Sequence, residues 1–167
     1  MRIIKVTYET VSELGREHSL AWQSSHKGIV SDDFLHSFTP ERQTVYFTEE
    51  MKDQNKSFHL AYLDDIAIGM ISLNISSQGE AEEMGEVISI YLLPDYQRNG
   101  YGKQMMDFAV ERLKRYQKKS IFLWVMNINQ KARMFYEAYG FEYSGVEKIL
   151  SEEKGITELK YCITIHD

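Results

Sequence analysis

The 167-residue sequence predicts one α/β domain, in which a mixed, mostly antiparallel sheet carries helices on both faces. The first observation is a run of alternating apolar and polar residues over 58–63, 66–75 and 87–93, which indicates three consecutive antiparallel strands. The second is the helical spacing of residues 102–118, followed by the apolar run 121–126. A strand, a helix and a buried strand in this order predict a right-handed βαβ unit.

The N-terminal third opens with a strand and continues with helices. Residues 2–8 form a short segment with β-branched side chains, which is typical of a strand. Residues 10–25 carry apolar side chains at helical spacing. Residues 31–56 are polar with scattered apolar positions, so we expect one or two short helices around Pro40.

The C-terminal part predicts a further helix and two closing strands. The helix spans residues 129–139 and ends at Gly140, and the strands cover 141–147 and 158–165. The acidic, glycine-punctuated linker 76–86 is interpreted as a solvated hairpin loop, with attraction of a cationic substrate as the alternative.

Composition excludes several classes of function. The chain has 25 acidic and 19 basic residues, and apart from one cluster at the predicted helix end near residue 115 the basic ones are scattered, which argues against nucleic-acid binding. No apolar run is long enough to span a membrane, and no signal peptide precedes the first strand. We therefore expect one domain over residues 1–167, in the cytoplasm, without a membrane partner.

Cysteine and histidine give no sign of a disulfide framework or a metal site. The single cysteine, Cys162, falls in a predicted strand and is interpreted as a buried structural thiol. The five histidines, the last of them His166, lack the spacing of metal ligands, so the sequence predicts no metal.

A glycine-rich loop joins the strand at 87–93 to the next helix. Gly100 and Gly102 let the backbone approach a ligand closely, and the helix N-terminus offers unpaired N–H groups, so the physical expectation is a phosphate. The dinucleotide fingerprint is excluded because Met105 stands where its third glycine would be, and the Walker loop is excluded by Gln104.

Two motifs resemble those of the GNAT family of N-acetyltransferases. Residues 97–102 (QRNGYG) match that family's Gln/Arg-x-x-Gly-x-Gly/Ala motif in full, and residues 129–141 resemble its second signature, Asn-x-x-Ala-x-x-x-Tyr-x-x-x-Gly-Phe. Residues 22–28 (WQSSHKG) are more loosely similar to a Ser-Trp-x-x-x-Tyr-x-Gly segment of one bacterial branch, with His26 in place of the tyrosine. The resemblance implies a GNAT fold whose βαβ unit binds acyl-CoA.

The resemblance also implies a donor site for acetyl-CoA, which serves as co-substrate. Backbone groups of the strand before the loop would bind the pantetheine arm, and the loop itself would bind the pyrophosphate. Asn129 and Arg133 share a helix face with Tyr136 and would face the cofactor. The predicted cofactor-binding residues are Ile90, Tyr91, Leu92, Gln97, Arg98, Asn99, Gly100, Tyr101, Gly102, Lys103, Asn129, Arg133 and Tyr136.

For catalysis, the resemblance makes Tyr136 the proton donor to the leaving thiolate, whereas a tyrosine on an apolar helix face would otherwise be a core residue. Glu86 is the candidate general base, with a plain strand-edge carboxylate as the alternative. Some relatives place a glutamate on the next strand, but Trp124 holds that position here, which leaves deprotonation through water open.

The predicted reaction is direct acetyl transfer to a primary amine in a ternary complex, and the alternative is a weakly active or inactive coenzyme-A-binding module. Trp22 and His26 are the candidate acceptor-binding residues. The acceptor is a small-molecule amine or a peptide amine, whose identity the sequence leaves open. A homodimer is a further expectation, since dimers are common in the family.

Overall fold

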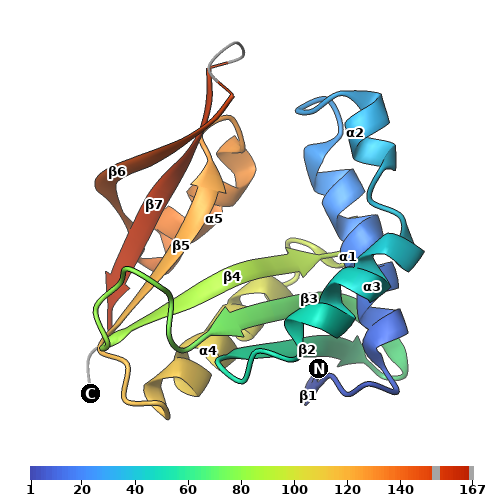
Figure 1. Ribbon diagram of the computed structural model, residues 1–167, viewed down its shortest axis with the longest axis horizontal. Helices are drawn as coiled ribbons and strands as arrows, with labels where there is room; N and C mark the ends of the chain where they lie inside the picture. Colours follow the sequence, from blue (N-terminus) through green and yellow to red (C-terminus); the bar gives the residue numbers. More distant parts are fainter. Residues whose placement is uncertain (152–154, 166–167) are drawn as a thin grey trace.

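The computed structural model describes residues 1–151 and 155–165, which form a seven-stranded sheet in the order β1-β2-β3-β4-β5-β7-β6 (Figure 1). Neighbouring strands are antiparallel except β4 and β5, which are parallel. The predicted mixed, mostly antiparallel sheet is therefore confirmed. The strands are β1 (Arg2–Lys5), β2 (Lys56–Leu63), β3 (Ile66–Asn74), β4 (Met84–Leu92), β5 (Ser120–Met126), β6 (Glu142–Ser151) and β7 (Ile156–Thr164).

Helices cover both faces of this sheet, as predicted. The helices α1, α2 and α3 lie together on one side, whereas α4 and α5 lie on the other (Figure 1). A short 3₁₀ turn, η1 (Pro94–Tyr96), connects β4 to the loop before α4. The helices are α1 (Val11–His26), α2 (Asp32–His36), α3 (Pro40–Glu50), α4 (Tyr101–Lys114) and α5 (Gln130–Tyr139).

Two hydrophobic clusters follow from this layering. The larger cluster joins α4 and α5 to the sheet and includes the fully buried Met106 and Leu113, while the smaller one joins α1 and α3 to the opposite face through Leu14 and Phe47. Because β3 is covered on both faces, all its residues after Ile66 are buried, so its sequence is almost continuously apolar.

Three boundaries differ from the sequence-based expectation. The helix predicted for residues 102–118 ends at Lys114, and Gln117 adopts a left-handed conformation with φ 60°, so Lys118 and Lys119 lie beyond the helix. Strand β4 begins at Met84, which places Glu86 inside the strand and shortens the acidic linker. Strand β7 lies between β5 and β6, an order that local periodicity did not predict.

Two further expectations need adjustment. Cys162 lies on β7 and is partly buried, so the thiol is less enclosed than the sequence predicted. His166 lies outside the described residues. Among those described, no helix is long and apolar enough to cross a membrane, and no group of three or more potential ligands could hold a metal ion.

A close contact between α1 and α3 sets the position of both helices. A Cβ atom added to Gly15 would lie 2.7 Å from the backbone nitrogen of Thr44 and 2.8 Å from the carbonyl oxygen of Pro40, both on α3. Backbone atoms cannot yield as a flexible side chain can. The absence of a side chain at Gly15 therefore permits the approach that builds this face.

We predict that Gly15→Ala lowers the free energy of unfolding by about 2 kcal/mol, because the methyl group forces the two helices apart. Chemical denaturation monitored by circular dichroism measures the change. Ser24→Ala, at an exposed position on the same helix, is the control and should leave stability nearly unchanged. Equal stabilities of the Gly15→Ala variant and the parent protein would contradict the close-packing account.

Candidate active site

The sheet opens between β4 and β5. These strands pair only through Met84–Glu86 on β4 and Ser120–Phe122 on β5, and beyond this point they diverge (Figure 1). Most of β4 therefore has a hydrogen-bonded neighbour, β3, on one side and an open edge on the other. An open edge inside a sheet offers unpaired N–H and C=O groups to a ligand.

The backbone alternation identifies which groups face the opening. Leu93 N–H donates to the Ile68 carbonyl of β3 at 2.8 Å, so the adjacent residue Leu92 directs its own N–H and C=O away from β3. Ile90, two residues earlier, has the same orientation as Leu92. Two predicted cofactor-binding residues, Ile90 and Leu92, thus present main-chain groups to the gap, while the main-chain groups of Tyr91 between them face β3.

The loop after β4 is held in shape by its own side chains. Gln97 Nε2 donates to the carbonyl oxygen of Leu92 at 2.9 Å, and Asn99 Nδ2 donates to the carbonyl oxygen of Gln97 at 3.2 Å. Arg98 has φ 62° and Gly100 has φ 80°, both in the left-handed region. Gln97 and Asn99 therefore shape the loop through bonds to its backbone.

Gly100 and Gly102 serve different purposes in this loop. A Cβ atom at Gly100 would meet nothing within 4 Å, so this glycine is required by its positive φ and leaves space for a ligand. A Cβ atom at Gly102 would lie 3.3 Å from the Phe135 ring of α5, so Gly102 allows α4 and α5 to pack closely. The N–H groups of Tyr101, Gly102 and Lys103 open α4 and lack intrahelical acceptors, which suits an anion.

Lys103 stands beside these N–H groups. Its Nζ lies 2.8 Å from one carboxylate oxygen of Asp107. The other carboxylate oxygen of Asp107 accepts a hydrogen bond from the Tyr139 hydroxyl at 2.8 Å. Both members of the ion pair are substantially exposed. Since exposed ion pairs contribute little, the ammonium group can turn toward a bound phosphate at small cost.

The predicted cofactor-facing residues of α5 have unequal surroundings. Asn129 caps the helix and accepts from Ala132 N–H at 3.2 Å, which leaves its amide N–H₂ group for other partners. Arg133 donates to the Tyr161 hydroxyl at 3.2 Å and to the Asn127 carbonyl oxygen at 3.0 Å. Arg133 therefore ties α5 to β7, and its part in cofactor binding stays a prediction.

Tyr136 lies on the inner face of α5. Its side chain is buried, and its ring contacts Phe135 and Phe141. Burial raises the pKa of Tyr136, and burial also raises the pKa of Tyr91, with a further contribution from the nearby Tyr136 hydroxyl. Both tyrosines therefore stay protonated at neutral pH.

Glu86 lies at the closed end of the opening, whereas a second carboxylate, Glu158, lies opposite Met126 at the far end of β5. Glu86 accepts a hydrogen bond from the Ser77 hydroxyl at 2.5 Å. Glu158, on β7, is half-buried; burial raises its pKa, Lys148 opposes this, and the charge of Glu86 raises it further. The two carboxylates are therefore within electrostatic range of each other but lie at different positions along β5.

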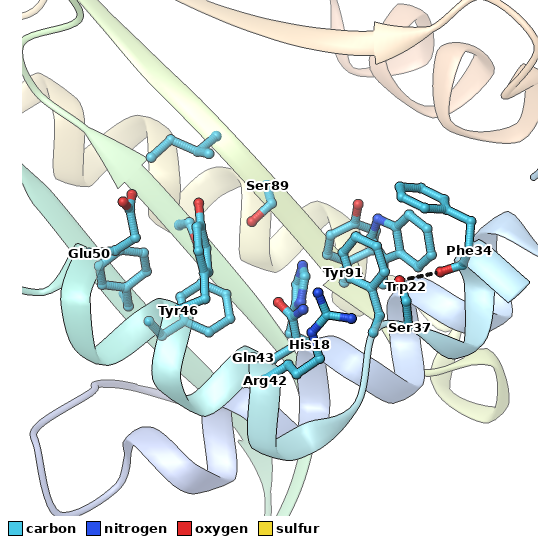
Figure 2. Close-up of a pocket in the computed structure, with 15 residues that line it drawn as sticks. His18, Trp22, Phe34, Ser37, Arg42, Gln43, Tyr46, Glu50, Ser89 and Tyr91 are labelled. Carbon is cyan, nitrogen blue, oxygen red and sulfur yellow. Dashed lines mark hydrogen bonds between the residues drawn. The ribbon is translucent and has the colours of Figure 1, made fainter. Parts of the chain in front are cut away.

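A pocket of about 550 Å³ lies on the face covered by α1 and α3 and reaches β4 (Figure 2). Ile88, Ser89 and Tyr91 of β4 form its floor, so it adjoins the strand that borders the opening. Half of the other lining residues are aromatic, namely Trp22, Phe34, Phe38, Tyr46, Phe47 and Phe58.

Of the two predicted acceptor-binding residues, only Trp22 lines this pocket. Its ring stacks on Phe38 with centroids 3.7 Å apart. His26 lies behind Trp22, where its ring stacks on the indole at 4.3 Å and its Nδ1 donates to the Trp22 carbonyl oxygen at 2.9 Å. His26 therefore supports the pocket wall from outside the cavity.

His18 contributes a neutral polar group to the pocket. It is 8% exposed, and its ring meets the rings of Phe47 and Tyr91 edge-on. Burial lowers its pKa to about 4, although a hydrogen bond with Gln43 opposes the shift. The imidazole is therefore uncharged at neutral pH.

The acetyltransferase (GNAT) family model matches residues 22–141, well over half of the chain. The chain belongs to this family. The prediction of the family and of the enzyme class, an acetyltransferase, is thereby confirmed. The matched region extends from α1 to the end of α5 and so includes β4, the glycine loop and Tyr136.

Individual relatives agree with this assignment. The uncharacterized N-acetyltransferase YuaI of Bacillus subtilis (strain 168) is 27% identical over 149 residues, covering 83% of each chain. A spermidine N(1)-acetyltransferase of Thermoplasma acidophilum is 28% identical over 142 residues, covering 80% of this chain and 81% of the relative. The crystal structure of the PaiA N-acetyltransferase of Thermoplasma acidophilum, in complex with coenzyme A, superposes with a TM-score of 0.78 at 21% identity over 98% of both chains. The last comparison confirms the predicted fold.

The sequence reasoning missed several residues that the fold brings to the site. His18, Arg42, Gln43 and Glu50 line the pocket, and Glu158 lies near Glu86. His18 sits on the apolar face of a helix that was predicted, a position that signals burial. No local pattern marks the others, because their placement depends on how separate elements pack.

Two buried histidines predict a loss of stability in acid. His18 and His59 both have a pKa lowered to about 4, chiefly by burial, against 6.5 when exposed. Between pH 6.5 and pH 4 the unfolded chain binds protons that the folded chain does not, so stability falls as pH falls through this window. Each histidine contributes about 3 kcal/mol to this loss. Urea denaturation at pH 7 and at pH 4.5 measures it.

His18→Phe and His59→Phe should each flatten this dependence, because phenylalanine does not titrate. His36→Gln, at an exposed position, is the control and should keep the parent slope. A slope unchanged in both phenylalanine variants would show that other groups cause the loss.

Proposed function

We propose that the protein transfers the acetyl group of acetyl-CoA to a primary amine by direct attack in a ternary complex, using residues 1–167 as one domain. The observation that carries the proposal is the open edge of β4, with the glycine loop at its end and Tyr136 across from it. One continuous strand-loop-helix segment thus offers the donors that a thioester, a pantetheine arm and a pyrophosphate each require.

On the donor side, the N–H groups of Tyr101, Gly102 and Lys103 bind the pyrophosphate, with added charge from Lys103 and Arg98. Ile90 and Leu92 pair through their backbones with the amides of the pantetheine arm. Gln97 acts on this site indirectly, because its side chain holds the loop against the Leu92 carbonyl.

In the reaction, the neutral amine attacks the thioester carbonyl carbon, and the carbon–sulfur bond breaks to release the thiolate of coenzyme A. Leu92 N–H donates to the carbonyl oxygen as negative charge develops on it. Tyr136 gives its hydroxyl proton to the thiolate, for which a phenol that stays protonated at neutral pH is suited. The proton lost by the amine leaves toward the carboxylates.

The proton acceptor is Glu86, acting through water, and Glu158 is a second carboxylate within electrostatic range of it. The raised pKa of Glu158 improves its basicity relative to an ordinary carboxylate. The Ser77 hydroxyl holds Glu86 in place. On β5, the ring centre of Trp124 lies 3.6 Å from Lys148 Nζ.

The aromatic pocket beside Tyr91 holds the body of the acceptor, with Trp22 as one wall and His26 as its support. The relative named for spermidine acts on a small amine, which fits the proposed chemistry at the level of an amine acceptor. A cytoplasmic location and a homodimer remain predictions that neither the fold nor the relatives test.

A coenzyme-A-binding module without turnover is the alternative function. The Tyr136 hydroxyl and a cavity of about 550 Å³ next to the donor strand favour the enzyme, since a pure binding module needs neither. Thiol release from acetyl-CoA in the presence of a panel of amines decides between them. Thermal stabilisation by acetyl-CoA without amine-dependent thiol release would support the binding module.

We predict that Tyr136→Phe lowers kcat about 100-fold and changes the KM for acetyl-CoA less than threefold, because a proton donor acts in the transition state. Steady-state thiol release measures both constants. Tyr139→Phe is the matched control, since it removes a hydroxyl of the same helix that donates to Asp107 of α4. Similar kinetics for Tyr136→Phe and the parent enzyme would remove Tyr136 from the mechanism.

Gly100→Val should weaken acetyl-CoA binding at least tenfold, because a branched side chain disfavours φ 80° and occupies the space above the helix N-terminus. Isothermal titration calorimetry measures the dissociation constant. Gly79→Val is the control, since Gly79 has φ 84° and equally open surroundings but lies in the acidic linker. If both variants bound acetyl-CoA with equal affinity, the loop would not be the pyrophosphate site.

A further inference from the structure

One charged side chain that lines the pocket beside β4 forms no ion pair within the described part of the chain. Among the residues that line it, only Arg42 and Glu50 carry a formal charge at neutral pH. Glu50 lies 2.6 Å from Lys56 Nζ, which in turn lies 3.9 Å from Asp53. Arg42 is exposed, and in Figure 2 its guanidinium group points into the pocket, beside His18 and Ser37.

Two buried polar atoms in the same pocket also lack partners. His18 Nδ1 and Ser72 Oγ have no hydrogen-bond partner among the described residues, and their side chains are 8% and 1% exposed. A buried polar atom without a partner costs free energy, so native structures usually satisfy it. Both atoms have almost no accessible surface and so belong to the interior of the pocket wall, which leaves Arg42 as the group with an unbalanced charge that a ligand in the pocket can reach.

The remaining wall is apolar and broad. Trp22 and Tyr91 both line the cavity, where Figure 2 draws them in the same part of the wall, and Phe38 stacks on Trp22. Such walls bind an aliphatic or aromatic body, while the few polar groups fix its orientation. Tyr91 belongs both to this wall and to the strand that borders the donor site, so a molecule in the pocket lies next to the acetyl group.

We propose that the acceptor is an amine that also carries a carboxylate, with the carboxylate bound by Arg42 and the apolar body packed against the aromatic wall that includes Trp22 and Tyr91. This inference rests on the proposed acetyltransferase function. The planar guanidinium group matches a carboxylate with two parallel hydrogen bonds.

The charges favour this class over two others. A polyamine would bring several positive charges next to Arg42, and the carboxylate of Glu50 is already paired with Lys56. A phosphorylated amine would bring a second negative charge that Arg42 alone cannot balance, close to Glu50. One guanidinium group fits one carboxylate.

Matched acceptors test the proposal directly. The kcat/KM for acetylation is measured for phenylalanine against phenylalaninamide and for 6-aminohexanoate against its amide, with spermidine as the polycationic competitor. In at least one pair the carboxylate should be preferred at least tenfold, and it should also exceed spermidine. Equal or reversed preference in both pairs, or spermidine as the best acceptor, would overturn the proposal.

Arg42→Gln should lower the carboxylate-to-amide ratio of kcat/KM at least tenfold. Arg115→Gln, at an exposed position that ends α4 on the opposite face of the sheet, is the control and should keep the parent ratio. An unchanged ratio in Arg42→Gln would assign the preference to another residue and overturn the role of Arg42.

A binding measurement separates this proposal from the proposed function. Titration calorimetry of the same pairs is carried out on the protein saturated with coenzyme A, so it requires no turnover. Selective binding of the carboxylates without acetylation of any amine would uphold the inference and contradict the enzyme. Acetylation of amines without carboxylate selectivity would uphold the enzyme and overturn the inference.

Discussion

The site depends on one constraint, the loss of backbone pairing between β4 and β5 after Glu86. A strand in the middle of a sheet normally has both edges satisfied, and unpaired groups away from water cost free energy. Here the main-chain N–H and C=O groups of Ile90 and Leu92 lie on the open edge and form no ladder hydrogen bonds with β3 or β5. A ligand that carries amides along an extended arm can take the place of the missing strand, and this makes the gap selective for an acyl-CoA.

The other parts of the molecule maintain that gap. The helices α4 and α5 pack closely at Gly102 and Phe135, so the loop that follows β4 and the helix that carries Tyr136 hold a fixed separation. On the opposite face, the contact at Gly15 sets α3 against α1, and these helices build the proposed acceptor pocket over β4. In the proposed reaction, donor and acceptor thus approach the same strand from its open edge and from one face.

Much of the donor site was predictable from sequence, and the acceptor site was not. The period-two strands, the glycine loop and the helix that carries Tyr136 are local patterns, and they lie where the sequence placed them. Glu158 joins Glu86 only because β7 inserts beside β5, which is a long-range pairing that no periodicity records. Arg42 lies on α3, in the least patterned region of the sequence, and His18 lies on the neighbouring helix α1. Both line the pocket because of the way these helices pack, which no local pattern records.

The central claim is that main-chain groups of β4 and of the α4 N-terminus bind acetyl-CoA. Amide hydrogen exchange, followed residue by residue by NMR with and without saturating acetyl-CoA, tests it most directly. The account predicts slowed exchange at the amides of Ile90, Leu92 and residues 101–103, with little change on β1 and β2. Unchanged exchange at these amides in the saturated complex would contradict it.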